Sequence, residues 1–179
     1  TITRNCPVSQ PSAITGSIDP EPGSSQTYSV TNVAGISYTW SFPSGWIITA
    51  GQSTNSVTVT VGGTNGTISV TPSNGSCSAA PRTLVTTIPN YRWKYISSTL
   101  GSATWSGGEN RNLSITIKNT GVSAWNSGVT TNLGVRWDSD NSSAAFAPWT
   151  DYHNRVTTGV VASGAQVTLS IPIQAKNAT

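Results

Sequence analysis

Two stretches of this chain alternate apolar and polar residues around a tryptophan, and that alternation limits what the chain can fold into. The first stretch spans residues 36–42 around Trp40, and the second spans residues 133–137 and ends at Trp137. A period of two places the apolar side chains on one face of a strand, so each stretch has a face to bury. Both stretches lie in sequence rich in Thr, Ser, Gly and Asn, which is typical of turns. Two such units, with few chemically reactive residues, favour a binding or spacer protein over an enzyme.

The length of 179 residues accommodates two domains near the usual size of an immunoglobulin-like sandwich, about 100 residues each. We therefore expect an all-β protein of two tandem immunoglobulin-like β-sandwich domains, residues 1–88 and 89–179. Pro89 makes the junction short and stiff. We expect the natural chain to continue beyond Thr179, because the second unit as given lacks a last strand. The expected strands are 13–18, 26–30, 36–42, 46–49, 57–61, 67–71 and 82–88, then 91–95, 113–117, 133–137, 156–161 and 167–173.

The charge distribution excludes several classes of partner. Charged residues make up only 8% of the chain, against about 25% in an average soluble domain. The net charge of +3 resides wholly in residues 89–179, where basic side chains are scattered and form no run, so we expect no nucleic-acid binding. A preference for acidic glycans or anionic surfaces remains open. No apolar stretch of about 18 residues exists, so we expect no membrane insertion. The composition points to a secreted or cell-surface location.

The chain has two cysteines, Cys6 and Cys77, and no methionine. A disulfide between them would connect the first strand of the first unit to a late one. In the loop-entropy model, closing about seventy residues stabilises the folded state by roughly 4 kcal/mol. The alternative is two unrelated thiols. Metal binding by two distant cysteines and a lone histidine is disfavoured, because zinc sites need four closely spaced ligands.

Residues 12–88 contain four short motifs in succession. They are ISYTWSFPSG at 36–45, TNSVTV at 54–59, GTISV at 66–70 and NGSC at 74–77. In this order and spacing the unit resembles the PKD-like domains of secreted Bacteroidetes proteins. The resemblance implies a β-sandwich with Trp40 in its core. It also implies a spacer or adhesive role in large exported multidomain proteins, often cargo of the type 9 secretion system, whose other domains would be its partners. Cys6 departs from the pattern, because the first cysteine lies earlier than the family leads us to expect.

The second unit resembles tryptophan-rich immunoglobulin-like modules found in binding and scaffold regions. The residues that carry this resemblance are Trp105, Gly108-Glu109, Lys118-Asn119-Thr120-Gly121, Trp125, Leu133 and Arg136-Trp137. The resemblance implies no catalytic residues.

The residues also argue against catalysis. A catalytic triad needs a nucleophile, a histidine and an acid, but no serine lies in a G-x-S-x-G sequence and the one histidine, His153, falls in a predicted loop. Glu109, Asp138, Asp140 and Asp151 lie in predicted turns rather than in the apolar cleft that a glycosidase acid requires. We therefore expect the chain not to be an enzyme.

One turn has the alternating oxygen ligands of a calcium loop. Asp138 and Asp140 stand two residues apart, and Asp151 would complete a site in space. The sequence lacks the glycine and the distal glutamate of an EF-hand, so an ordinary turn after a strand is the alternative. We expect no cofactor other than this calcium ion.

The seven tryptophans fall into two groups. Trp40, Trp93 and Trp137 are in phase with other apolar residues, so we expect them to be buried. The other four, Trp46, Trp105, Trp125 and Trp149, adjoin Gly, Ser, Asn or Pro and are candidates for partial exposure or for packing under loops. Exposed rings stack on sugar faces, so Trp149, Tyr152 and His153 form a candidate platform for a polysaccharide or cell-surface glycan. A carbohydrate-binding accessory module of a polysaccharide-degrading enzyme is therefore the alternative to a spacer.

Overall fold

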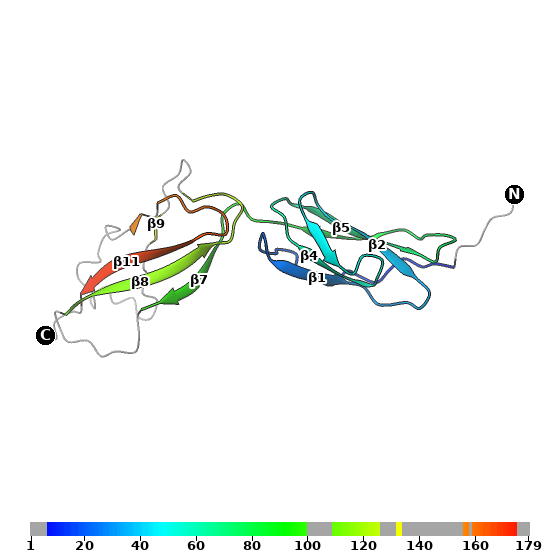
Figure 1. Ribbon diagram of the computed structural model, residues 1–179, viewed down its shortest axis with the longest axis horizontal. Coiled ribbons are helices and arrows are strands. Elements are labelled where there is room, and N and C mark those ends of the chain that lie inside the picture. The colour runs from blue at the N-terminus through cyan, green and yellow to red at the C-terminus, as the bar shows by residue number, and fades with distance from the viewer. Residues whose placement is uncertain (1–6, 100–108, 126–131, 134–155, 158, 175–179) are drawn as a thin grey trace, which may run out of the picture. The chain divides into compact units, whose positions relative to one another are not determined.

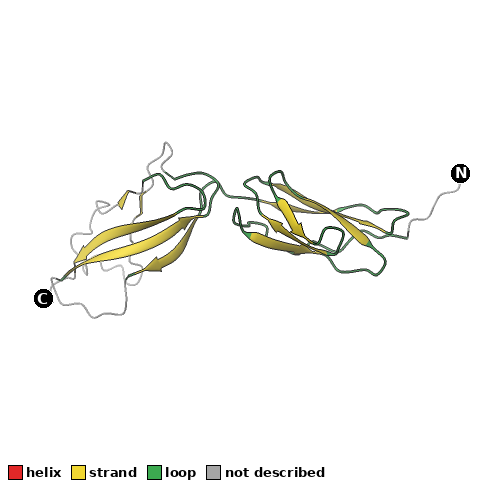
Figure 2. Ribbon diagram, viewed as in Figure 1, coloured by secondary structure: helices red, strands yellow, loops and turns green. Residues whose placement is uncertain are grey.

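The fold is made of strands in each of two units (Figure 1). The computed structural model describes residues 7–99, 109–125, 132–133, 156–157 and 159–174. Across these residues there are eleven strands and no helix (Figure 2), so the all-β prediction is confirmed. The chain divides into two compact units, Thr1–Pro89 and Asn90–Thr179.

The first sheet of the first unit has the strand order β1-β4-β3. Its strands are β1 (Ser25–Ser29), β4 (Ser56–Thr60) and β3 (Ile47–Ala50), and both pairings are antiparallel. The N-terminal segment extends this sheet beyond β1, because Thr15 and Ser29 exchange two backbone hydrogen bonds of 2.8 and 3.0 Å.

The second sheet has the order β2-β5-β6 and is also antiparallel. Its strands are β2 (Ser37–Ser41), β5 (Gly66–Ser73) and β6 (Arg82–Thr86). With the N-terminal segment beside β1, this strand order is that of an immunoglobulin-like sandwich, in which four strands face three. The alternating segments of the first unit therefore form strands of a sandwich, as predicted.

An aromatic cluster fills the space between these two sheets. Trp40 is 3% exposed, and its ring stacks on Phe42 with the ring centroids 6.3 Å apart. Phe42 stacks in turn on Trp46 at 5.9 Å, and Tyr28 tilts against Phe42 at 5.7 Å. Rings at these separations add to the stabilisation from buried area, so the cluster is the centre of the first core.

In the first unit, the polar atom of each buried indole ring has a backbone partner. Trp40 Nε1 donates to Thr54 O at 2.8 Å, and Trp46 Nε1 donates to Thr64 O at 3.1 Å. Both acceptors lie in loops, so the rings also fix those loops. Two buried tyrosines behave in the same way, with Tyr28 donating to Ser17 O and Tyr38 donating to Thr31 O.

The second unit is built on one long antiparallel sheet of order β11-β8-β7. Its strands are β11 (Gln166–Gln174), β8 (Asn110–Asn119) and β7 (Trp93–Ser98). A separate antiparallel pair joins β9 (Asn132–Leu133) to β10 (Val156–Thr157).

The described core of this unit lies on β8 and β11. Ile117 and Leu169 contribute from the sheet, and Trp125 and Val161 cover them from the loops. Trp125 and Val161 are held together by two backbone hydrogen bonds of 3.0 and 3.3 Å. The cover is therefore built from segments far apart in the sequence.

Asn119, the last residue of β8, hydrogen-bonds to the loop segments that cover this core. Its side chain is fully buried, and its Nδ2 donates to Ser123 O and Val161 O, each at 2.9 Å. Its Oδ1 accepts from Gly121 N at 3.0 Å. One amide thus bonds three backbone groups around the Lys-Asn-Thr-Gly turn, of which Val161 O also accepts from Trp125 N. Buried polar groups without a partner are costly, so these bonds help to fix the turn.

Replacing Trp40 with phenylalanine should destabilise the first unit by about 2–3 kcal/mol, because it removes the bond to Thr54 O and opens a cavity. Hydrogen exchange read by mass spectrometry checks this, since it reports on peptides of each unit separately. The exposed residue Val85 provides the control, because Val85→Thr should change stability by under about 0.5 kcal/mol. Equal loss of protection in both variants would contradict the assignment of Trp40 to the core.

Replacing Asn119 with alanine should destabilise the second unit by about 2–3 kcal/mol, because three backbone groups each lose one hydrogen bond, although Val161 O keeps its bond from Trp125 N. Asn119→Asp should be no better, since aspartate keeps an acceptor for Gly121 N but has no Nδ2 donors. Urea unfolding of both variants checks this, with Asn112→Ala on the exposed surface of the same strand as control. A fully stable Asn119→Asp variant would show that the donors are dispensable.

Candidate functional site

The residues predicted to bind sugar or calcium all lie outside the described residues. The sugar platform of Trp149, Tyr152 and His153 falls in 134–155, and so do Asp138, Asp140 and Asp151. Both sites therefore stay predictions. Within the described part of the chain, no three His, Cys, Asp or Glu side chains gather as metal ligands would. The same residues contain no helix that is long and apolar enough to span a membrane.

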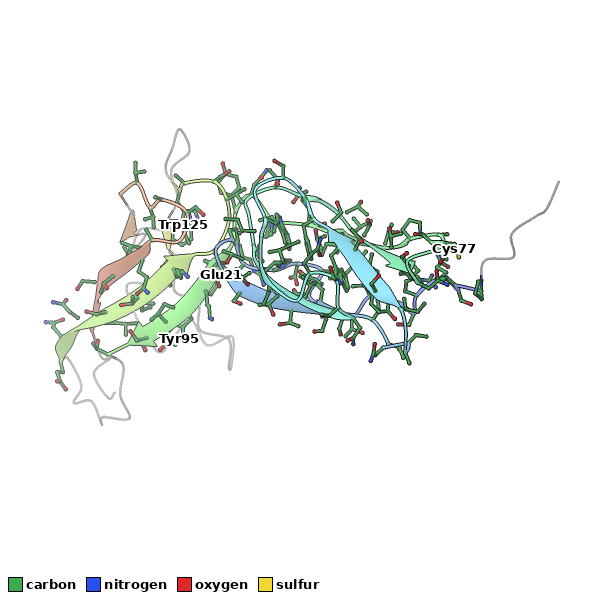
Figure 3. The ribbon with its side chains drawn as sticks, turned by 45° about the vertical axis from the view of Figure 1, so that its right-hand side comes forward. Glu21, Cys77, Tyr95 and Trp125 are labelled. Carbon is green, nitrogen blue, oxygen red and sulfur yellow. The ribbon has the colours of Figure 1, made fainter. Side chains whose placement is uncertain are left out.

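Cys77 lies in the loop between β5 and β6, at one end of the first unit (Figure 3). The loop is ordered by Asn74, whose Oδ1 accepts from the backbone N–H groups of Ser76 and Cys77, each at 3.0 Å. Gln10 donates to Pro81 O at 2.9 Å, so the start of the described chain runs close to this region. Cys6 lies outside the described residues, and its pairing with Cys77 stays a prediction.

The structure corrects the expected exposure of one tryptophan and decides between the alternatives for two others. Trp40 is buried as predicted, but Trp93 is 63% exposed, so the prediction that it lies in the core was wrong. Trp46 and Trp125, candidates for partial exposure, are buried at 8% and 4%. They follow the alternative of packing under loops. Three more tryptophans lie outside the described residues, namely Trp105, Trp137 and Trp149.

The aromatic residues of the first core are structural. Burial raises the pKa of Tyr28 to about 12, because desolvation penalises the phenolate. Its hydroxyl therefore stays a hydrogen-bond donor to Ser17 O through the neutral range and is a poor candidate for a general base. Gly16 packs directly against the Tyr28 ring. A Cβ at this position would lie 2.1 Å from the ring, so only glycine leaves room for it.

The exposed aromatic side chains gather on β7, the edge strand of the second sheet. All six residues of this strand are exposed. Tyr95 pairs with Ile117 and Trp93 pairs with Asn119, so both rings lie on the face that carries the core. Tyr95 stands on β7 and is 53% exposed (Figure 3). Its hydroxyl donates to Ser98 Oγ at 2.9 Å, which orients the ring. Among the described residues, the buried cluster covers β8 and β11 and stops short of β7.

The opposite face of the same strand carries positive charge. Lys94 pairs directly with Lys118 across the β7–β8 ladder, so two ammonium groups start from the same face of neighbouring strands. Like charges directly opposite one another in a sheet are destabilising. Edge strand β7 therefore has an aromatic face and a cationic face, both open to solvent.

The comparisons with known proteins bear on the first unit. The family model of the PKD-like domain matches residues 7–88. Residues 7–88 are a PKD-like domain. PKD-like domains are generally non-catalytic modules and typically extracellular. Neither the curated proteins nor the solved structures gave a match to the chain.

Sequence reasoning missed the surface on β7 for identifiable reasons. A period of two predicts which side chains of strand 91–95 share a face with Trp93, but it does not tell whether that face is covered. The Lys94–Lys118 pair was overlooked because the two residues lie 24 positions apart and meet only through the strand register. The signal available was the excess of basic residues in the second half of the chain.

Peptide mapping by mass spectrometry under non-reducing conditions should find a Cys6–Cys77 cross-link. Cys77→Ser should then lower the stability of the PKD-like domain by roughly 4 kcal/mol, because the unfolded chain regains the entropy of a seventy-residue loop. Ser76→Ala, in the same exposed turn, is the control and should have little effect. Two free thiols after alkylation of the native protein would rule the pairing out.

Proposed function

We propose that the chain is a non-catalytic spacer or adhesive region of a large secreted or cell-surface bacterial protein, in which other domains of a longer parent chain are its partners. The resemblance to Bacteroidetes proteins exported by the type 9 system supports this setting. The observation that carries the proposal is the way the two ends of the PKD-like domain are bonded together.

The N-terminal segment runs alongside β6 in the same direction. Arg82 Nε donates to Pro11 O at 3.1 Å near the start of this contact, and Thr87 N donates to Ile18 O at 2.8 Å at its end. A pull on the two ends of the domain loads such bonds in shear, because the two parallel segments are drawn in opposite directions. Bonds in shear must break together, so this arrangement supports a load-bearing role.

The connection to the second unit leaves little free chain. Ile88 is 2% exposed, and its N–H donates to Asn65 Oδ1 in the first unit. On the other side, Asn90 O accepts from Ser123 N at 2.9 Å within the second unit. Pro89 alone separates these two anchored residues, and its ring fixes φ. A tether this short supports a spacer rather than a flexible hinge.

Single-molecule stretching of the chain tests the load-bearing role. With the Cys6–Cys77 bond reduced, unfolding of residues 7–88 should release roughly 280 Å of chain, less the end-to-end distance of the folded domain. With the bond intact, only residues 78–88 can extend, which is roughly 40 Å. The disulfide would thus hold most of the domain together under load.

Two variants sharpen this experiment. Arg82→Ala removes one bond between β6 and the N-terminal segment and should lower the unfolding force. Thr83→Ala, an exposed neighbour on the same strand, should not. A PKD-like domain that unfolds at the same low force in all three forms would count against a mechanical role.

A carbohydrate-binding accessory module is the second candidate function. One observation favours it, namely the exposure of Trp93 on β7. The burial of Trp125 argues against it, because a buried ring cannot stack on a sugar. Any binding role would therefore rest on β7.

A further inference from the structure

The first unit contains two Asn-Gly sequences, and the structure holds them differently. Asn65-Gly66 lies where the chain enters β5, and Asn74-Gly75 lies in the loop that follows this strand. An asparagine before glycine can react with its own backbone, because glycine has no side chain to hinder attack by its nitrogen. A hydroxyl residue follows both dipeptides, so a difference in reactivity between them in the native protein would come mainly from the fold.

The fold restrains the first of these sites. Asn65 Oδ1 accepts from the N–H of Ile88, a residue that is 2% exposed. Gly66 pairs with Thr86 in the β5–β6 ladder, and its carbonyl accepts from Thr86 Oγ1 at 3.1 Å. Turning the Asn65 side chain onto its own backbone would leave the buried Ile88 N–H without this partner, which is costly.

The second site lies in an exposed loop and has only nearby partners. Asn74 and Gly75 are both exposed, and the φ angle of Gly75 is +85°, which glycine adopts at little cost. The Gly75 N–H donates to Ser73 Oγ at 3.1 Å. The nitrogen that would attack is thus bonded to a side chain two residues away, whereas Gly66 is part of a ladder.

The loop also places two donors on the oxygen that would take up negative charge. Asn74 Oδ1 accepts from the backbone N–H groups of Ser76 and Cys77, each at 3.0 Å. Because these donors follow Asn74 in the chain, its side chain is folded toward the next peptide group, as in an Asx turn. Attack on Cγ turns Oδ1 into an oxyanion, and preorganised backbone donors stabilise an oxyanion more than a neutral carbonyl.

We propose that Asn74 is a site of spontaneous deamidation that the native loop promotes. The Gly75 nitrogen loses its proton and forms a bond to Cγ of Asn74, while Nδ2 gains a proton and leaves as ammonia. Water then adds to either carbonyl of the resulting succinimide and opens the ring. Addition at Cγ gives aspartate, and addition at the main-chain carbonyl gives isoaspartate, in which the chain runs through Cγ. Either product carries a new negative charge.

The two products differ in their effect on the loop that contains Cys77 (Figure 3). Aspartate keeps an oxygen acceptor for the N–H groups of Ser76 and Cys77. Isoaspartate lengthens the main chain and moves the carboxylate away from this position, so both bonds are lost. We therefore expect faster hydrogen exchange at these two amides in the isoaspartate form and unchanged exchange in an Asn74→Asp variant.

Incubation of the whole chain in mildly alkaline buffer, which speeds loss of the Gly75 amide proton, tests the proposal. Digestion in mildly acidic buffer and peptide mapping by mass spectrometry then separate the asparagine, aspartate and isoaspartate forms. In the native protein Asn74 should react at least about tenfold faster than Asn65, a factor that corresponds to about 1.4 kcal/mol. In concentrated urea the two sites should react at similar rates. Asn74 should react at least as fast in the native protein as in urea, because unfolding removes the donors to Oδ1.

Asn74→Gln is the matched variant, because it keeps the amide but would have to close a larger and less favourable ring. It should abolish the modification at position 74 and leave the rate at Asn65 unchanged. Native Asn74 that reacts no faster than Asn65 would overturn the proposal. So would an Asn74 that reacts more slowly in the native protein than in urea, because the bonds from Ser76 and Cys77 would then protect the amide rather than activate it.

Discussion

The packing of four aromatic rings between two sheets is the interaction on which the PKD-like domain depends. Trp40, Phe42 and Trp46 stack in series, and Tyr28 closes the cluster. The polar atoms of Tyr28, Trp40 and Trp46 each donate a hydrogen bond to a separate loop. The same contacts thus supply hydrophobic stabilisation and fix the turns. Gly62 permits the arrangement, because a Cβ there would lie 2.9 Å from Trp46 Cδ1.

Strand positions could be predicted from the sequence because they depend on local alternation. The run around Trp40 predicted β2, and the alternating valines predicted β4, each to within one or two residues. Burial could not be predicted as well, since it depends on what arrives from elsewhere in the chain. Trp125 has polar neighbours but is covered through its pairing with Val161, 36 residues later. Trp93 has the right phase and yet nothing among the described residues covers it.

The two units place their aromatic residues differently. In the PKD-like domain each tryptophan is buried with its N–H bonded, so none is available to a ligand. In the second unit Asn119 and Trp125 close the core over β8 and β11, while β7 keeps its rings in solvent. A domain that buries its tryptophans in its core suits a stalk, and a domain that leaves some exposed suits contact with a ligand.

The charge of the chain follows the same division. The PKD-like half has equal numbers of acidic and basic side chains, whereas the second half carries the whole excess of +3. Lys94 and Lys118 place part of that excess on β7 and β8, on the face of the sheet opposite Trp93 and Tyr95. The two faces of the exposed strand β7 therefore differ, since one carries Trp93 and Tyr95 and the other carries Lys94.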